Sequence, residues 1–427
     1  MTSRSPRAAE AGCHVWLADG PNAQAYWERA DRLLPGGGIY LTRSARFAGS
    51  GILPGFIASG EGCRVIDVDG KEYIDFLCAN GPILLGYRHP EVDEAARRQM
   101  EQVNSASFFP PALVELAECL VERTSGMAWA VPAKNGSDVV ALGARVARAA
   151  TRRDTLILFE RAYHGFDPEW VPGGAGVPAS RRDNVLRVAW NDSKQLERVA
   201  HEHRTEIGGI VLNPLDQNPA LDTIEPTEAF LRMIDEVRDQ TGSPLVFDDI
   251  RAGFRMHASG SHVALGVQPD LICLGKALGN GYAVSALLGT EELRAAARSI
   301  MFTASFAFDA VALRAAVATL EVYDRDDAFA RIQRSGERLR DGLLSAAKNT
   351  GHRIRYTGPP TMPTLLFEDD PNLDRGRRFS LEAAARGALF HPNLNWFLNA
   401  SHDDAAIDEA VSIAAEAFDA IPPPADS

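Results

Sequence analysis

The sequence predicts an α/β protein with a doubly wound, mostly parallel sheet that lies between helices. Short apolar runs without polar alternation, such as Thr155–Phe159, are typical of parallel strands that are buried on both faces. Between such runs, apolar residues recur at helical spacing, so that Val139, Leu142 and Val146 would share one face of a helix. A chain of 427 residues can bury a large core, and we expect one large domain and a smaller one.

Composition and charge argue against several classes of function. Hydrophobic residues make up 45% of the chain and charged residues 24%, as in ordinary globular proteins. The net charge of −13 and the lack of a basic stripe argue against a nucleic-acid partner. No apolar run is long enough to cross a membrane, and residues 1–20 lack the apolar core of a secretory signal. The five cysteines show no C-x-x-C spacing, so we expect neither disulfides nor a metal site, and a cytoplasmic location.

The N-terminal part of the chain predicts a helix, a loop and a hairpin. Residues 21–35 have the pattern of an amphipathic helix that ends at Pro35. Glycines 36–38 then open a loop that carries Arg43. Residues 63–76 predict a hairpin with its turn at Asp69-Gly70, and a helix is expected from 91 to about 103.

The middle of the chain predicts a helix start that binds an anion, followed by a series of strands. Gly136-Ser137-Asp138 precedes a helix, and free backbone amides at such a start, with the serine hydroxyl, form an anion site. Strands are expected at 155–159, 209–214, 244–247, 269–274 and 284–288, with a crossover helix before the third. The C-terminal part predicts helices at 310–324, 328–349 and 405–418 and a strand near 364–367.

Two of these strands end in residues that carry chemistry. The strand at 244–247 ends at Asp248, and the strand at 269–274 ends before Lys276, in a glycine-rich turn with room for a bulky group. An acid and a lysine at two strand ends are typical of pyridoxal phosphate sites. In these sites the lysine forms a Schiff base, and the carboxylate keeps the ring nitrogen protonated.

Both segments resemble signatures of the class III aminotransferases, which are fold-type-I pyridoxal phosphate enzymes. The run D-D-I-R-A-G-F-R from Asp248 is similar to the family's D-E-V-x-T-G-F-R, and L-G-K-A-L-G-N-G around Lys276 is similar to L-G-K-x-x-G-G-G. The resemblance covers nearly the whole chain and extends to the branch around glutamate-1-semialdehyde aminomutase. It implies a large coenzyme-binding domain at 76–322 and a small α+β domain built from both termini, at 1–75 and 323–427.

The resemblance also implies which residues hold the coenzyme. Asn135, Gly136 and Ser137 match the family's phosphate cup, N-S-G-T-E-A. Tyr163 lies with His164 in the family's Y-H-G segment, and its ring would stack on one face of the coenzyme.

Further matches concern the second face of the ring, the neighbouring subunit and the substrate. Ile250 would pack on the other face of the coenzyme ring. Ser305 resembles a residue that reaches the phosphate of the neighbouring subunit, which implies a homodimer. Arg43 resembles the arginine that faces the substrate in the family's N-terminal loop.

The resemblance implies a transaminase that acts on small molecules. Lys276 would give up its imine and accept the α-proton of an amino donor, and a keto acid or aldehyde acceptor would complete a ping-pong cycle. An isomerase, either an aminomutase or a racemase, would use the same chemistry without net exchange of amino groups. A non-enzymatic scaffold on this fold would be expected to lack Lys276 or Asp248, and both are present.

Departures from the aminomutase branch favour transfer over isomerisation. The chain has Phe-Pro-Pro at 109–111 and Trp396-Phe397 where that branch carries acidic residues, and these side chains would make an apolar wall. An aminomutase needs polar anchors to retain its released intermediate between half-reactions, whereas a transaminase releases one product and admits another. Asn213 also replaces a glutamate of the family, which puts the family's usual substrate gating in doubt.

Overall fold

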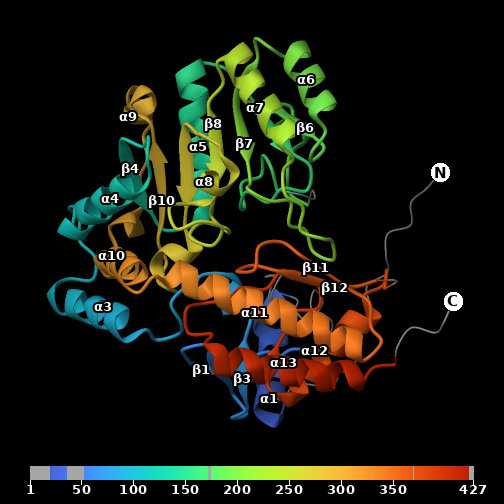
Figure 1. Cartoon of the computed structure of the whole chain (residues 1–427). Helices are drawn as coiled ribbons and strands as arrows, with labels where there is room; N and C mark the ends of the chain where they lie inside the picture. Colours follow the sequence, from blue (N-terminus) through green and yellow to red (C-terminus); the bar gives the residue numbers. More distant parts are fainter. Residues whose placement is uncertain (1–19, 36–51, 172–174, 369, 423–427) are drawn as a thin grey trace.

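The computed structural model describes residues 20–35, 52–171, 175–368 and 370–422, which form two lobes (Figure 1). The large lobe contains a seven-stranded sheet, and the small lobe contains a four-stranded sheet with the first and last helices. Elements from the two ends of the chain, blue and red in Figure 1, lie together in the small lobe. This agrees with the prediction of a small α+β domain from both termini.

The large sheet has the strand order β4-β10-β9-β8-β7-β5-β6. All its pairings are parallel except those of β10, which runs antiparallel to both of its neighbours. The predicted, mostly parallel sheet is thereby confirmed, and it has seven strands. Its strands are β4 (Trp129–Ala133), β5 (Thr155–Phe159), β6 (Val185–Val188), β7 (Ile207–Leu212), β8 (Leu245–Asp248), β9 (Leu271–Leu274) and β10 (Ser285–Gly289).

Helices bury both faces of this sheet, which explains why its central strands are apolar throughout. On one face, Leu156 and Leu158 of β5 pack in a cluster with Val139 of α5 (Gly136–Thr151). On the other face, Phe159 packs against Phe230 of α7 (Glu228–Thr241), with ring centroids 5.0 Å apart. The remaining helices of this lobe are α3 (Pro90–Gln102), α4 (Pro111–Arg123), α6 (Ser193–Glu202), α8 (Ser261–Leu265), α9 (Arg294–Ser299) and α10 (Ala310–Arg325).

The small lobe joins N-terminal strands to a C-terminal one. The hairpin of β2 (Arg64–Asp67) and β3 (Glu72–Asp75) lies between β1 (Ile57–Glu61) and β13 (Ala388–Leu389), which pairs parallel with β3. Its turn is the predicted one, with Gly70 at φ 87°, a value that favours glycine. The other elements are α1 (Pro21–Leu33), α11 (Ala328–Asn349), β11 (Ile354–Thr357), β12 (Thr364–Phe367), α12 (Asp374–Arg386) and α13 (Asp404–Asp419).

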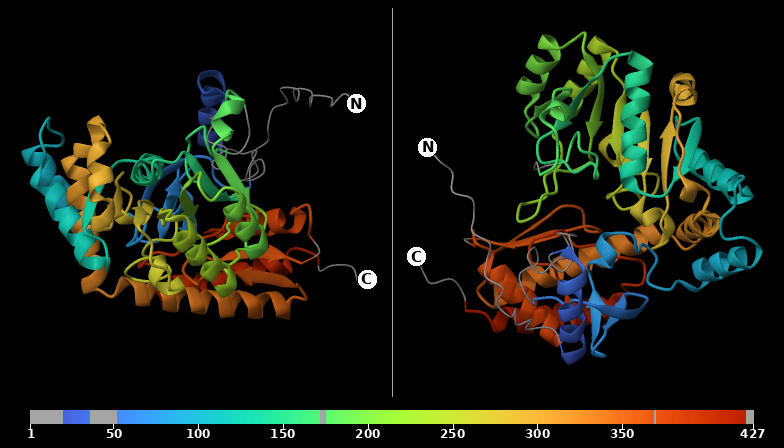
Figure 2. Two further views of the ribbon diagram at one scale, coloured as in Figure 1. Left: turned by 90° about the horizontal axis from the view of Figure 1, so that it is seen from above. Right: turned by 180° about the vertical axis from the view of Figure 1, so that it is seen from behind.

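The long helix α11 packs against α13 of the small lobe and also contacts α10 of the large lobe, and it lies between the two lobes in Figure 1. Seen from above, in the left view of Figure 2, this helix runs along the lower edge of the picture. Within the described ranges no helix is long and apolar enough to cross a bilayer. The domain limits at 75/76 and 322/323 stay predictions.

Candidate active site

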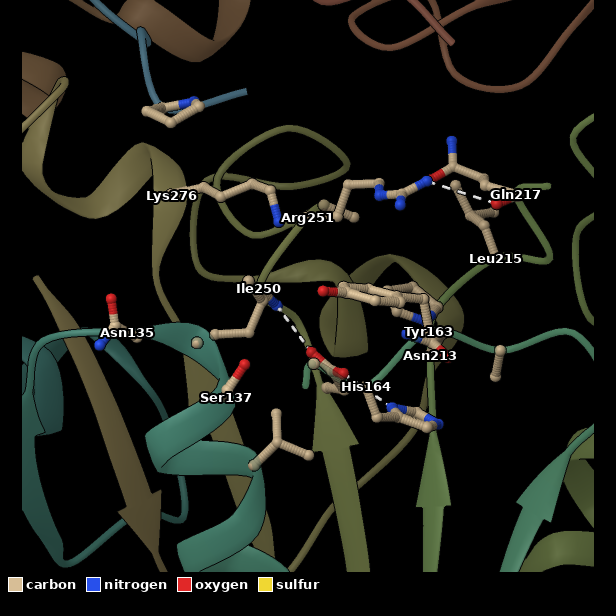
Figure 3. A pocket seen from close by; sticks show the side chains of 18 of the residues that line it. Asn135, Ser137, Tyr163, His164, Asn213, Leu215, Gln217, Ile250, Arg251 and Lys276 are labelled. Carbon is tan, nitrogen blue, oxygen red and sulfur yellow. Dashed lines mark hydrogen bonds and ion pairs between the residues drawn. The ribbon is translucent and has the colours of Figure 1, made fainter. Parts of the chain in front are cut away.

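A cavity of about 370 Å³ lies at the edge of the large sheet where β5, β7, β8 and β9 end. Ligands of open α/β sheets bind outside the carboxyl ends of the strands, because the loops there diverge. The cavity is lined by Lys276, Asp248, Tyr163, His164, Ile250 and the start of α5 (Figure 3). Segments more than 140 residues apart in the sequence therefore converge here, as the sequence analysis expected.

Lys276 follows β9 at the start of a short 3-10 turn, η5 (Lys276–Gly279), and its φ is 39°. Burial lowers its pKa to about 8, because the interior disfavours the ammonium form. A side chain at Gly81 would collide here: an added Cβ would lie 3.2 Å from Cδ of Lys276 and 3.0 Å from Cε1 of Phe397. Gly81 also has φ 105°, so close packing and backbone conformation both require glycine beside the lysine.

Asp248 is the last residue of β8 and is 4% exposed. Its Oδ2 lies 2.8 Å from Nδ1 of His164, and its Oδ1 accepts a hydrogen bond from the Ile250 amide at 3.2 Å. The next acid, Asp249, does not line the cavity; its Oδ2 accepts a hydrogen bond from the Ser261 amide, and burial raises its pKa to about 7. Of the two adjacent acids, Asp248 is the one that lines the cavity.

The start of α5 forms the floor of the cavity and is suited to an anion. The Asp138 carboxylate accepts hydrogen bonds from the backbone amide of Asn135 at 2.9 Å and from its side-chain amide at 3.1 Å. The side chain of Asn135 is thus engaged in capping the helix. Ser137 Oγ accepts a hydrogen bond from the Phe166 amide at 3.1 Å. The Asp138 amide donates to the Asn135 carbonyl at 3.1 Å, whereas the amides of Gly136 and Ser137 stand at the very start of the helix, ahead of any i−4 acceptor within it.

Tyr163 and Ile250 lie on facing sides of the cavity, below the Lys276 side chain in Figure 3. Ile250 is held between two glycines, since an added Cβ at Gly136 or Gly275 would lie 3.0 Å from it. Tyr163 is 56% exposed, so one of its faces is open to a flat ligand.

Not every expected residue reaches the cavity. Ser305 lies in an exposed turn, η7 (Ser305–Phe308), and is absent from the cavity lining of its own chain. Arg43 lies outside the described residues.

The prediction for Trp396 was wrong. Its ring is 1% exposed, packs 4.6 Å from the Phe390 ring and donates Nε1–H to the His391 carbonyl at 2.9 Å. It belongs to the core of the small lobe. Phe397 alone approaches the lysine, through the Gly81 contact described above.

Sequence reasoning missed Arg251, which lines the cavity two residues beyond the buried Asp249. Position 251 is variable in the family signature, so only its place directly after Ile250, a residue expected at the coenzyme, signalled it. The sequence also gave no sign of the contact between His164 and Asp248.

These residues fit pyridoxal phosphate. A buried carboxylate suits a protonated ring nitrogen, a helix start suits a phosphate, and a half-buried lysine of lowered pKa suits an aldehyde. The Nε2 of His164 has no hydrogen-bond partner among the described residues. The ring of His164 therefore contacts Asp248 through Nδ1 and makes no further hydrogen bond through Nε2 to the described residues.

Comparison with known proteins agrees with this fit. The family model of the class-III aminotransferases matches residues 48–168 and 175–412. The aminopentol aminotransferase of Sphingopyxis macrogoltabida is 36% identical over 405 residues, which is 95% of this chain and 96% of the relative. A glutamate-1-semialdehyde 2,1-aminomutase of Natranaerobius thermophilus is 29% identical over 368 residues, 83% of this chain and 85% of the relative. The solved FumI protein of a Sphingopyxis species, in its pyridoxal phosphate internal aldimine form, superposes with a TM-score of 0.91 at 36% identity, covering 94% of this chain and 96% of the other.

Proposed function

Because the chain belongs to the class-III aminotransferase family and is a pyridoxal-phosphate-dependent aminotransferase, we propose that the cavity around Lys276 and Asp248 is its active site. The enzyme moves an amino group from an amine or amino acid to a keto acid or aldehyde in two half-reactions. Bound pyridoxal phosphate supplies the carbonyl that takes up the amino group and a ring that withdraws electrons. The observation that best supports this site is the half-buried lysine that faces the same cavity as the buried carboxylate.

Two residues do the chemical work in this proposal. Lys276 bonds the coenzyme through Nζ and, once released, takes the proton from the α-carbon of the donor; its lowered pKa keeps a useful fraction of the amine neutral. The carboxylate of Asp248 would hold a proton at the ring nitrogen of the coenzyme. His164 orients that carboxylate through the 2.8 Å contact.

The remaining residues position the coenzyme. Gly136 and Ser137 hold its phosphate at the start of α5, with Asn135 fixed by its contact with Asp138. Tyr163 and Ile250 hold the two faces of its ring.

The donor is proposed to carry an apolar skeleton. Leu215 and Ala252 line the cavity and pack in one buried cluster with Met362 and Phe397. Such a wall favours an apolar group on the donor over a second charged end.

A donor-only experiment tests the reaction type. Holoenzyme mixed with an amine or amino acid that reacts, but with no acceptor, is expected to release one product per active site and then stop, because the coenzyme is left aminated. Adding pyruvate should restart the reaction. The measurement follows the visible absorbance of the lysine-bound coenzyme together with product yield. Continuous rearrangement or racemisation of the donor would instead make the enzyme an isomerase.

We also propose a homodimer, on the basis of an apolar surface beside the cavity. Phe108 is 85% exposed and Phe306 63%. Their segments lie side by side, with the rings of Phe109 and Phe308 5.1 Å apart. Lys134, which lines the cavity, lies 5.1 Å from the Phe306 ring centroid, so this surface continues to the mouth of the cavity. Large exposed apolar patches commonly mark protein interfaces, and a second copy would bring its Ser305 to this mouth.

A charge placed on this surface is expected to separate the subunits. Phe108→Glu combined with Phe109→Glu should give a monomer in sedimentation velocity, because buried, unpaired carboxylates oppose association. Leu344→Glu, at an exposed position of α11, is the matched control and should remain dimeric. A wild-type chain that sediments as a fully active monomer would contradict the proposal.

We propose a cytoplasmic location as well. The described cysteines, Cys63, Cys78, Cys119 and Cys273, are all free thiols, as is usual in a reducing compartment.

A further inference from the structure

Arg251 brings a positive charge into the cavity beside Lys276. Both side chains line it, and Figure 3 shows them reaching into the same part of the cavity. Nη1 of Arg251 donates to the Gln217 carbonyl at 3.3 Å and to Oδ1 of Asn395 at 3.4 Å. Both contacts are long and both acceptors are neutral, so they hold the guanidinium in place without balancing its charge. Asn395 belongs to the small lobe, so this contact links Arg251 of the large lobe to the small lobe beside the cavity.

No carboxylate among the described residues forms an ion pair with Arg251. Three acids line the cavity: Asp248 is engaged by His164, Asp216 by Arg161 at 2.5 Å, and Glu160 is exposed at the end of β5. Asn213, which also lines the cavity, adds no charge.

A partly buried guanidinium without an ion-pair partner is costly, and burial lowers the pKa of Arg251, an effect that the nearby Asp248 partly offsets. Its charge is also felt at the lysine, where it adds to the effect of burial in lowering the pKa of Lys276. An anion that enters this cavity would therefore meet a preformed cation that has no ion-pair partner among the described residues and lies close to the reacting amine.

We infer that Arg251 binds the carboxylate of the amino acceptor, and that the preferred acceptor is a 2-oxo acid whose carboxylate adjoins the reacting carbonyl. The inference rests on the proposed function and refines it, since an aldehyde acceptor would leave Arg251 unpaired. The guanidinium fork suits a carboxylate in two-point contact. Arg251 gives up no proton and forms no bond in the transfer; it positions the acceptor and selects it by charge.

The test compares two acceptors that differ only in the carboxylate. Enzyme loaded with pyridoxamine phosphate is mixed with pyruvate or with acetaldehyde, and the return of the visible absorbance of the lysine-bound coenzyme is timed. In the Arg251→Gln variant, kcat/KM for pyruvate is expected to fall about 10- to 100-fold, which corresponds to the loss of one charge-assisted hydrogen bond. The kcat/KM for acetaldehyde is expected to change by less than about threefold. Arg251→Lys should recover part of the loss, because it restores the charge but not the fork.

Each outcome decides the matter. The acetaldehyde rate reports folding and coenzyme loading, so a selective loss on pyruvate supports the inference. An equal loss on both acceptors, or no loss on pyruvate, overturns it. A pyruvate-selective loss in Arg43→Gln but not in Arg251→Gln also overturns it, because the carboxylate would then bind the N-terminal loop. A wild-type enzyme that reacts with neither acceptor overturns the proposed function itself.

Discussion

Replacing Lys276 by alanine is expected to abolish amino transfer, with a loss of at least about 10⁴-fold in kcat/KM. The variant loses both the amine that bonds the coenzyme and the base that removes the α-proton of the donor. It should also lose the visible absorbance of the lysine-bound coenzyme, since the other lysine among the described residues that line the cavity is paired with Asp309. Absorbance spectra and donor turnover of the purified variant check both expectations.

Lys134 offers the matched control, because it is the other lysine among the residues described as lining the cavity. Its Nζ pairs with Asp309 at 3.4 Å and lies over the Phe306 ring. Lys134→Ala should therefore keep the bound-coenzyme absorbance. If Lys276→Ala stayed fully active while Lys134→Ala lost the absorbance, the coenzyme assignment at Lys276 would be wrong.

Asp248→Asn is expected to retain the coenzyme but to lower kcat by about 10³-fold, equivalent to about 4 kcal/mol of transition-state stabilisation. A neutral amide cannot hold the proton at the ring nitrogen, and an unprotonated ring is a poor electron sink. In the wild type, a carboxylate oxygen of Asp248 lies 2.8 Å from Nδ1 of His164. The asparagine side chain of the variant would put either its NH₂ group or its neutral carbonyl oxygen at this position. Single-turnover kinetics with a saturating donor measure the loss.

Asp249→Asn is the control for this change, since it alters the adjacent buried acid in the same way. Asp249 does not line the cavity, and because burial raises its pKa to about 7 it is largely neutral below that pH. Its amide variant should stay within about threefold of wild type near pH 6, a difference under 1 kcal/mol. An Asp248→Asn enzyme within the same limit would show that another group partners the ring nitrogen.

The sequence predicted the parts of the fold that are buried on both faces. The sequence predicts the strands β5, β7, β8, β9 and β10 because each is a short, continuous apolar run. These runs alternate along the chain with segments of helical spacing, which is typical of buried parallel strands. The missing strands, β4 and β6, are the two edges of the sheet. Pro132 interrupts β4, and β6 is only partly buried, so neither has the apolar pattern of a central strand.

The site was predicted where it depends on strand ends and was missed where it depends on long-range packing. Lys276 and Asp248 end neighbouring strands, so local pattern and signature were sufficient to place them. The contact between His164 and Asp248 joins residues 84 positions apart, and no local spacing encodes it. The prediction for Trp396 was wrong for the same reason. The local sequence is compatible with a ring that faces the cavity or the core of the small lobe, and in the structure the ring packs against Phe390 in the core.

The central claim is that Lys276 bonds the coenzyme in this cavity, and reduction of the holoenzyme tests it most directly. Borohydride fixes the lysine–coenzyme bond, and peptide mapping by mass spectrometry then locates the added mass. The account predicts a single modified peptide that carries the coenzyme on Lys276. Attachment at any other lysine, or a holoenzyme whose peptides all keep their unmodified mass after reduction, would contradict it.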